Sequence, residues 1–357
     1  MRVCFDNIIY FLQRSGGISK YWFELTCRFA QSGDHRYVEY SGESGNMFRS
    51  GLEIPDSAII RDRIRPLKLA RYMPVASCTA GCDIFHSSYY RFPFDKNIIN
   101  IVTVYDFIYE YYTSGLKQKV HSMQKEAAVK RAGGIICISE NTKRDLLKFY
   151  PYVDPDSVSV VYVGVDSGFH PLGEDRDALK ESLGLDLNTK YAVFVGSREG
   201  YKNFGTAVKA AAMAGMGLSL VGGGDLSADE KSLLDRYMHG RYVHFINGVD
   251  TEKLNRIYNA SFCLLYPSSY EGFGMPPAEA MRAGCIPVTS DTSSLPEVVG
   301  DGGLMCYGKE PECYAEMISR LNSPELRADI TEKALEQGKK FTWDKCFAET
   351  LTVYEKI

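Results

Sequence analysis

The residues best placed to do chemistry lie in the segment 266–304. There, Gly272 and Gly274 interrupt a loop between an apolar strand and a helix, and glycine lets the backbone approach a small ligand closely. The N–H groups at a helix start favour an anion or a polar ligand. Glu271 and Glu279 bracket the loop, and because carboxylates repel phosphate, we expect them to bind hydroxyl groups such as those of ribose or a hexose. The alternative is an ordinary helix entry, in which Glu279 only stabilises the helix dipole.

A second pair of candidate residues, Arg198 and Lys202, follows the apolar stretch 191–195. Cations just beyond a parallel strand are well placed to neutralise a pyrophosphate, including the charge that develops on a leaving group. The alternative interpretation is a pair of exposed loop charges.

The N-terminal region begins with a strand, a glycine loop and a helix, the first unit of a Rossmann-like domain. We assign the strand to residues 3–5 and the apolar run 8–11, and the loop to Gly16 and Gly17. This loop either lets the backbone approach a phosphate or an acceptor, or it is only a structural turn.

Polar residues also end three later strands of this region. His86 ends one strand, and Tyr105 and Asp106 end the next. Ser139 ends a third strand and is placed to cap the helix after it. Ligands of open α/β sheets bind beyond the carboxyl ends of the strands, so these side chains are candidates for substrate contact. A lone histidine at a strand end is otherwise a hydrogen-bonded structural residue.

Metal-ligating patterns are weak. Asp154-Pro155-Asp156 and Asp175-Arg176-Asp177 have D-x-D spacing, but the first is a proline turn and the second an acidic linker. An oxygen-ligand site needs convergent carboxylates, which neither motif supplies. Cys78, Cys82 and His86 also suggest a metal site, although their context favours core packing. We therefore expect no metal and no resident cofactor.

These segments need a scaffold that repeats strand, loop and helix. A chain of 357 residues has room for two domains with a core each. We expect an α/β protein with an N-terminal domain over 1–165, completed by a C-terminal helix over 341–357, and a second domain over 166–340.

Composition is that of an ordinary globular protein, with 45% hydrophobic and 24% charged residues. No apolar run reaches the roughly 20 residues of a membrane span, and the N-terminus lacks a signal-peptide pattern, so we expect a cytoplasmic protein. Ten cysteines are scattered without a CxxC motif, as expected of buried, reduced thiols. Residues 1–165 contain 21 Lys and Arg against 17 Asp and Glu, which leaves 20 against 28 in the remainder. The more basic half is the one expected to meet a phosphate or an anionic surface.

Two longer motifs connect these observations to a known family. The chain reads E-G-F-G-M-P-P-A-E-A-M-R-A-G from Glu271 and then, after P-V-T-S-D, L-P-E-V-V-G-D-G-G-L up to Leu304. This ungapped stretch resembles the C-terminal signature of the retaining nucleotide-sugar glycosyltransferases of family four. The resemblance is strong over 191–304 and loose before residue 160. It implies the GT-B fold, an α/β architecture in which two Rossmann-like domains face a central cleft and the last helix returns to the first domain.

The resemblance also implies roles for the candidate residues. The residues implied to act in catalysis are Asp106, Arg198, Lys202 and Glu271, with Arg198 and Lys202 as a diphosphate clamp. The residues implied to bind the donor are Gly17, Asn247, Gly272, Phe273, Gly274, Met275 and Glu279, with Asn247 near the base and Glu279 on the ribose. The residues implied to bind substrate are Gly16, His86, Tyr105 and Ser139. Tyr105 stands where the family has a histidine that touches the transferred sugar, so this departure concerns sugar identity.

The implied reaction is a metal-independent transfer of a hexose, with retention of configuration, from a UDP- or GDP-sugar. The implied acceptor is a saccharide or a lipid-linked saccharide in bacterial cell-surface polysaccharide synthesis, and no nucleic-acid partner is expected. Two other classes stay open: a nucleotide-sugar epimerase on the same scaffold, and a sugar-binding protein without catalysis.

A basic segment raises the question of membrane contact. Arg61, Arg63, Arg65, Lys68 and Arg71 alternate with apolar residues. Such a segment is either a solvated helix face or an amphipathic surface that lies on an anionic membrane or grips a lipid-linked phosphate.

Overall fold

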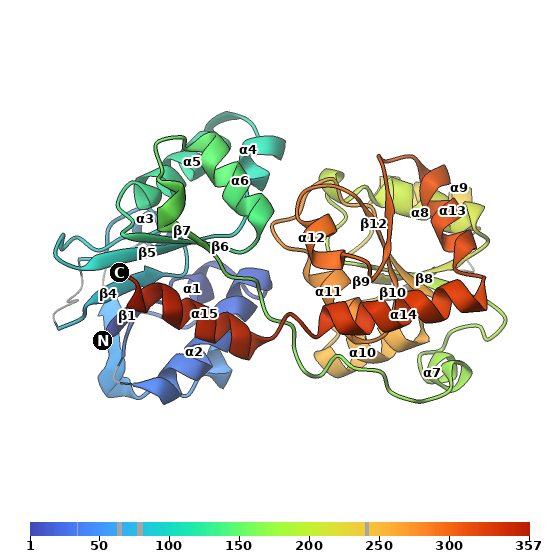
Figure 1. Cartoon of the computed structure of the whole chain (residues 1–357), viewed down its shortest axis with the longest axis horizontal. Coiled ribbons are helices and arrows are strands. Elements are labelled where there is room, and N and C mark those ends of the chain that lie inside the picture. The colour runs from blue at the N-terminus through green and yellow to red at the C-terminus, as the bar shows by residue number, and fades with distance from the viewer. Residues whose placement is uncertain (34, 63–65, 77–80, 240–242) are drawn as a thin grey trace. The chain divides into compact units, whose positions relative to one another are not determined.

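The computed structural model divides into two compact units, and each is described by itself (Figure 1). Unit 1 contains Met1–Gly164 and Trp343–Ile357, and unit 2 contains Val165–Thr342. The domain boundaries expected from the sequence lie within two residues of these limits. The residues that the structure describes are 1–33, 35–62, 66–76, 81–239 and 243–357.

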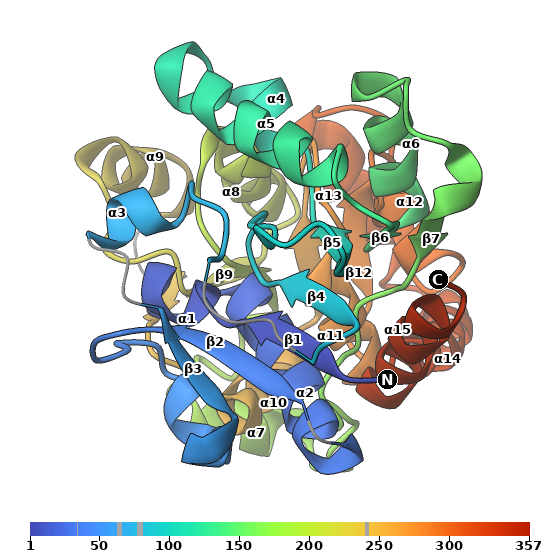
Figure 2. The same cartoon turned by 90° about the vertical axis from the view of Figure 1, so that its left-hand side faces the viewer.

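Unit 1 is built on a parallel sheet. Its seven described strands have the order β3-β2-β1-β4-β5-β6-β7, so the strand order reverses between β1 and β4. Figure 2 shows β1 between β2 and β4. The strands are β1 (Val3–Asp6), β2 (Arg36–Tyr40), β3 (Ile59–Asp62), β4 (Ile84–Ser87), β5 (Ile99–Val104), β6 (Gly134–Cys137) and β7 (Val158–Val160).

Helices cover both faces of this sheet, with α5 and α6 on one face and α2 and α15 on the other (Figure 1). The helices are α1 (Ile9–Leu12), α2 (Gly17–Ser32), α3 (Leu67–Ala70), α4 (Ile108–Tyr112), α5 (Gly115–Val129), α6 (Glu140–Phe149) and α15 (Trp343–Glu355). The C-terminal helix α15 is fixed to α2 by an ion pair of 2.8 Å between Arg28 and Asp344 and by edge-to-face contact of Phe29 with Phe347. The return of the last helix to the first domain, which the resemblance implies, is confirmed.

One expected strand is wrong. The apolar run 8–11 does not continue β1, because the chain turns after Asn7 and forms the short helix α1. The backbone N–H of Ile9 donates to the Ser88 hydroxyl at 3.0 Å, which holds this turn against the end of β4. Ile8, Ile9 and Tyr10 are fully buried, so a short apolar run here reflects burial rather than a strand period.

Unit 2 is built on a second parallel sheet. Its six described strands have the order β10-β9-β8-β11-β12-β13, so the strand order reverses between β8 and β11. The strands are β8 (Tyr191–Val195), β9 (Gly217–Val221), β10 (Val243–Ile246), β11 (Cys263–Tyr266), β12 (Pro287–Ser290) and β13 (Leu304–Cys306).

The helices of unit 2 also cover both faces of its sheet, with α8, α9 and α13 on one side and α10, α11 and α14 on the other (Figure 1). The core between the first group and the sheet is apolar and includes Phe194, Phe204, Leu220 and Tyr314. The helices are α7 (Arg176–Ser182), α8 (Phe204–Met213), α9 (Ala228–Met238), α10 (Thr251–Ala260), α11 (Met275–Arg282), α12 (Leu295–Val299), α13 (Pro311–Arg320) and α14 (Pro324–Gly338).

The basic segment does not form one amphipathic helix. Arg61 lies in β3 and pairs with the buried carboxylate of Glu39 at 3.4 Å, whereas Lys68 lies in the short helix α3. Arg63 and Arg65 lie outside the described residues. Within the described part of the chain, we find no helix whose length and apolarity would let it cross a membrane.

Candidate active site

The sheet of unit 2 creates a place for a ligand where its strand order reverses. After β8 the chain adds β9 and β10 on one side, and it then crosses back to place β11 on the other side. Loops that leave two neighbouring strands in opposite directions open a crevice beyond their carboxyl ends, and ligands of parallel sheets bind there. Lys202 follows β8 in the short turn Gly200–Lys202, and Glu271 follows β11. These two predicted residues therefore flank the reversal point.

The structure brings Lys202 and Glu271 into direct contact. The Lys202 ammonium donates to Glu271 Oε1 at 2.5 Å and to the Tyr266 hydroxyl at 2.7 Å. The Lys202 and Glu271 side chains are 11% and 10% exposed, so the pair is shielded but not sealed from solvent. An ammonium has three N–H donors, and hydrogen bonds within the described residues occupy two of them. A ligand oxygen can take the third.

Tyr266 was not predicted as a site residue, because it ends an apolar strand and reads as core. Burial, and then the neighbouring Glu271 carboxylate, raise the pKa of its hydroxyl well above the usual value of 10.0. The phenol therefore stays neutral and orients the charges of Lys202 and Glu271. Only the structure reveals this role, because Lys202 and Tyr266 are 64 residues apart.

The loop after Glu271 is held by two serines. The Glu271 N–H donates to the Ser293 hydroxyl at 2.8 Å, and the Ser294 hydroxyl donates to the carbonyls of Glu271 and Phe273 at 2.9 and 2.8 Å. Sequence reasoning missed both serines, although they stand directly before the L-P-E-V-V motif. They fix the backbone whose amides were predicted to face the donor sugar.

Helix α11 begins at Met275 after Gly274, whose φ of 107° lies in the region that favours glycine. A Cβ atom at Gly274 would also lie 3.0 Å from Leu295, so both the backbone angle and the packing favour glycine at this position. Pro276 and Pro277 occupy the first turn and have no N–H group to donate. The helix start therefore offers few N–H donors, and contact of the 272–275 backbone with a ligand stays a prediction.

Glu279 lies on the first turns of α11, half-buried at the side of the same helix. Its Oε2 accepts a hydrogen bond of 3.1 Å from the hydroxyl of Tyr258, a fully buried residue of α10. Burial, and then the Glu279 charge, raise the pKa of Tyr258 well above its usual value. A neutral phenol thus fixes the direction of a carboxylate, which is the arrangement needed to accept hydrogen bonds from ligand hydroxyls.

Arg198 is held by residues of its own unit. Its side chain is only 3% exposed, and its Nε pairs with Glu230 at 2.9 Å. Its terminal nitrogens donate to the four consecutive carbonyls of the loop 222–225, at 2.9 to 3.1 Å. The Arg198 guanidinium thus donates to five acceptors, four of which are carbonyls of the glycine loop after β9. In this arrangement Arg198 supports that loop, and its part in a diphosphate clamp stays a prediction.

Three residues of unit 1 that were predicted to contact substrate are buried in the protein. His86 is fully buried, and its ring nitrogens lie 2.5 Å from the Tyr354 hydroxyl and 2.9 Å from Thr103 Oγ1. Burial lowers the pKa of His86 to about 3, so the imidazole is neutral at physiological pH. Tyr105 is 5% exposed, accepts from Trp22 Nε1 at 2.5 Å and donates to the Ser88 carbonyl at 3.1 Å.

Ser139 is the third of these residues. It is fully buried, and its hydroxyl accepts from the Thr142 N–H at 3.0 Å as the N-cap of α6. The capping role expected from the sequence is confirmed, and the same hydroxyl is not exposed to a substrate.

Three other predicted residues of unit 1 lie at the carboxyl edge of its sheet and are accessible. Gly16 and Gly17 are exposed at the start of α2, which follows β1 and the short helix α1. Asp106 follows β5 and is half-buried, with its Oδ1 accepting from the Ile108 N–H at 3.0 Å. The Lys125 ammonium donates to the Asp106 carbonyl at 2.7 Å and so fixes the loop. Ligand contact by these residues stays a prediction.

Asn247 is exposed directly after β10, at the edge of the unit 2 sheet. The two D-x-D motifs form local structure, since Asp154 caps a turn through the Asp156 N–H and Asp177 pairs with Lys180 at 3.0 Å. Among the described residues, no group of three or more metal-ligating side chains converges. Cys78 lies outside the described residues.

Comparison with known families covers most of the chain. The family model described as "Glycosyl transferases group 1" matches residues 175–337, and the model described as "Glycosyltransferase Family 4" matches residues 15–169.

Relatives and solved structures agree with these matches. Alpha-maltose-1-phosphate synthase from Mycolicibacterium smegmatis is 32% identical over 263 residues, which cover 67% of this chain and 67% of the relative. O-antigen chain mannosyltransferase B from Escherichia coli is 27% identical over 252 residues, which cover 68% of this chain and 66% of the relative. The crystal structure of HepE from Anabaena in complex with UDP-glucose superposes with a TM-score of 0.75 at 15% identity and covers 100% of both chains. At that identity the likeness shows a shared fold.

Proposed function

The chain belongs to glycosyltransferase family 4 and has the GT-B fold, and from this premise we propose that it is a retaining hexosyltransferase that uses a nucleotide-diphosphate sugar. The observation that carries the proposal is the contact of Lys202, Tyr266 and Glu271 at the strand-order reversal of unit 2. The Gly272–Met275 backbone follows Glu271 directly, is held by Ser294 and is shaped by the positive φ of Gly274.

The proposed reaction breaks the bond between the anomeric carbon of the sugar and the terminal oxygen of the diphosphate. Negative charge then grows on the diphosphate, and the third N–H of Lys202 together with the loop amides stabilises it. The acceptor oxygen forms the new bond on the same face of the sugar, and its proton passes to the departing diphosphate. The products are the glycosylated acceptor and the nucleoside diphosphate, with the anomeric configuration retained.

Glu271 and Glu279 bind hydroxyl groups in this scheme. Glu271 lies next to the Lys202 ammonium and orients the donor sugar, while Glu279, directed by Tyr258, binds the ribose. Asn247 binds near the base. In unit 1, Gly16, Gly17 and Asp106 are proposed to contact donor or acceptor, because they are the predicted residues that remain accessible at the carboxyl edge of that sheet.

The scheme assigns the charge of the leaving group to Lys202, so we propose that transfer needs no metal and no resident cofactor. Dialysis against EDTA followed by a transfer assay tests this point. Retained activity supports it, whereas activity that returns only with Mn²⁺ or Mg²⁺ contradicts it.

The donor is proposed to be a UDP- or GDP-hexose and the acceptor a saccharide or lipid-linked saccharide of a bacterial cell surface. The name of the O-antigen mannosyltransferase relative supports a surface polysaccharide, while the name of the maltose-1-phosphate synthase relative points to a small phosphorylated acceptor. A thermal-shift screen against UDP-, GDP-, dTDP- and CMP-sugars selects the donor. A transfer assay with the selected donor then discriminates the two acceptor classes.

The same assay separates the two alternative functions. An epimerase converts the donor into an isomer without an acceptor, and a non-catalytic sugar-binding protein binds a sugar without turnover. Product analysis by chromatography with and without acceptor gives a different result in each case. Isomerisation of the donor in the absence of acceptor would contradict the proposed transfer.

Cytoplasmic location and peripheral contact with an anionic membrane are further parts of the proposal. Lys68 is exposed in α3 beside Leu69 and Tyr72, which are 51% and 44% exposed, so apolar and basic groups are adjacent. Binding of Arg61→Glu and Lys68→Glu variants to vesicles of anionic lipid tests the contact. Binding equal to that of the unchanged protein would remove this part of the proposal and leave the transfer reaction untouched.

A further inference from the structure

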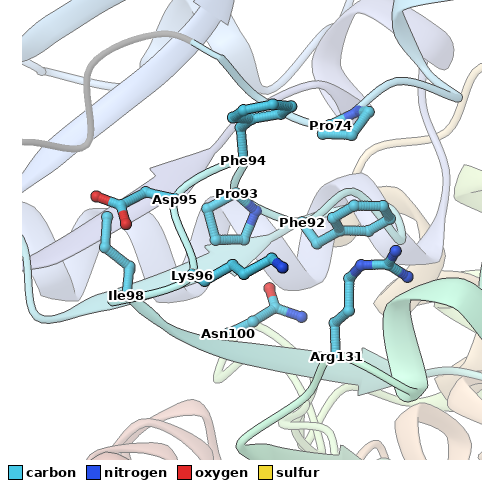
Figure 3. Close-up of a pocket in the computed structure, with 9 residues that line it drawn as sticks. All are labelled: Pro74, Phe92, Pro93, Phe94, Asp95, Lys96, Ile98, Asn100 and Arg131. Atoms are coloured by element: carbon cyan, nitrogen blue, oxygen red, sulfur yellow. The ribbon is translucent and has the colours of Figure 1, made fainter.

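Unit 1 has a pocket at the other edge of its sheet from the residues considered so far. The pocket has a volume of about 360 Å³ and lies between the loop 92–96, the start of β5 and Arg131 (Figure 3). Asn100 is the second residue of β5, whereas Asp106 follows the far end of that strand. At about 3.3 Å per residue, the two are roughly 20 Å apart along the strand. The pocket is therefore separate from the carboxyl edge at which the reaction is proposed.

Asn100 supplies this pocket with an unsatisfied acceptor. The residue is only 3% exposed, and its Oδ1 has no hydrogen-bond partner among the described residues. Its Nδ2 group lies 3.5 Å from the Ala128 carbonyl, and exchanging the amide oxygen and nitrogen would set two oxygens against each other. Figure 3 shows the side chain directed into the pocket beside Arg131. Because a buried unpaired acceptor costs about 1–3 kcal/mol, a ligand that donates a hydrogen bond here gains binding energy.

The remaining lining defines what else the ligand must carry. The Arg131 guanidinium lies 4.3 Å from the centroid of the half-buried Phe92 ring, and Phe94 is 75% exposed at the rim. Aromatic faces of this kind pack against the C–H faces of sugar rings. Arg131 and Lys96 are exposed cations on the same pocket, against one exposed carboxylate, Asp95, whose Oδ1 accepts from the Asn97 N–H, so the net charge of the lining favours an anionic group.

We propose that this pocket binds one ring of a saccharide that carries a carboxylate or a phosphate. A ring hydroxyl donates to Asn100 Oδ1, the C–H face of the ring packs against Phe94, and Lys96 and Arg131 bind the anionic group. Inorganic phosphate has no apolar face to pack against Phe94, so it can use only the cations and one hydrogen bond of the site. A neutral sugar leaves both cations unused. The site goes beyond the transfer reaction, because it holds a saccharide at a place that chemistry at Lys202 does not need.

The test follows unit 1 directly, because both tryptophans, Trp22 and Trp343, belong to that unit. Thermal unfolding of the full chain is monitored by tryptophan fluorescence with glucuronic acid, glucose 6-phosphate, glucose or inorganic phosphate. We expect the two acidic sugars to raise the unfolding midpoint, and glucose and inorganic phosphate each to raise it less. The apparent affinity for the acidic sugars should fall about tenfold in Asn100→Leu and in Arg131→Gln, as loss of one hydrogen bond to a buried or charged group predicts.

Two controls make the outcome specific. Arg144→Gln changes an exposed arginine of unit 1 outside the pocket and should leave sugar binding unchanged. Lys202→Met should leave it unchanged as well, so failure of this site and failure of the proposed transfer are separate results. Asn100→Leu removes an unpaired acceptor without changing side-chain size much, so its stability should be equal or higher. If it does not fold, Phe94→Ala replaces it.

Three results would overturn the proposal: no shift with either acidic sugar, an equal shift with inorganic phosphate alone, or unchanged binding in the pocket variants. The second of these would identify a simple anion site.

Discussion

The carboxyl edges of the two sheets carry polar residues in similar positions but in different states. At the edge in unit 2, Lys202 and Glu271 are paired at 2.5 Å with side chains 11% and 10% exposed. At the edge in unit 1, His86 and Ser139 are fully buried, and Tyr105 is 5% exposed. The first group has donors and acceptors that a ligand can use, whereas the second group is satisfied inside the protein.

The difference comes from what covers each strand end. In unit 1, Trp22 of α2 donates to Tyr105, and Tyr354 of α15 contacts His86. Helices from distant parts of the sequence thus bury these strand ends. In unit 2, Lys202 and Glu271 come from loops that leave neighbouring strands, and their partners belong to the same edge. A position at a strand end is therefore not sufficient to make a side chain accessible to a ligand.

The largest expected effect belongs to Lys202. Lys202→Met should lower kcat/KM for transfer on the order of 10²–10³-fold, because it removes the cation proposed to meet the charge on the diphosphate. Steady-state assays with the donor found by the thermal-shift screen measure this value. Lys231→Met, which changes an exposed lysine of α9 in the same unit, is the matched control. Equal rates for the two variants would contradict the proposal that the edge of unit 2 carries the reactive site.

A variant of Arg198 tests whether this side chain supports the loop 222–225 or binds the diphosphate. Arg198→Leu should lower the free energy of unfolding of unit 2 by about 2–4 kcal/mol, because four loop carbonyls and Glu230 lose their donor. The transfer rate should fall far less than in Lys202→Met. Differential scanning calorimetry measures the stability, and Arg236→Leu, at an exposed arginine of α9, is the control. A large loss of rate with unchanged stability would instead support Arg198 as a diphosphate ligand.

The fold and part of the site could be predicted from the sequence because they depend on residues that are neighbours in the chain. The segment 266–304 contains strand, glycine loop, helix and second loop in one continuous stretch, so its geometry follows from neighbouring residues. Gly274 has a positive φ, and Glu279 lies on the helix that follows, as the motif implies.

The remaining parts depend on partners far away in the chain. His86 is covered by Tyr354, which is 268 residues away, and Arg198 is committed to carbonyls 24 to 27 residues away. No local pattern reveals these contacts. The strand predicted over residues 8–11 was wrong for another reason: a buried single-turn helix and a strand have the same short apolar pattern.

The buried histidine of unit 1 predicts a pH dependence of the stability of that unit. In unit 2, burial also lowers the pKa of His244 in β10, although that residue is only half-buried. Burial lowers the folded-state pKa of His86 to about 3, against an ordinary value of 6.5. Below pH 6.5 the unfolded chain therefore binds a proton that the folded chain does not, so the stabilising contribution is complete above pH 6.5 and is lost as the pH falls toward 3. The free energy of unfolding of unit 1 should fall by roughly 1.4 kcal/mol per pH unit from this residue in that range.

Urea unfolding at pH 4 to 7, followed by tryptophan fluorescence, measures this slope. His86→Gln should reduce the pH dependence of the free energy of unfolding by the equivalent of about one proton. A pH dependence of the same sign should remain, because burial also lowers the pKa of His121 to about 3. An unchanged slope in His86→Gln would mean that the imidazole is protonated in the folded protein, and hence that this strand end is open to water.

Substitution of Ser139 has the smallest expected effect on stability. Each unit has a serine that caps a helix, so the same substitution can be made in both. Ser139→Ala removes the N-cap of α6 and should lower the free energy of unfolding of unit 1 by about 1 kcal/mol, with no change in the KM for acceptor or donor. Ser227 caps α9 of unit 2 in the same way, through the Glu230 N–H at 3.2 Å. Ser227→Ala should therefore shift the calorimetric transition of unit 2 and leave the tryptophan signal of unit 1 in place. A raised KM in Ser139→Ala alone would show that the hydroxyl reaches substrate, and the two edges would then differ less than their burial indicates.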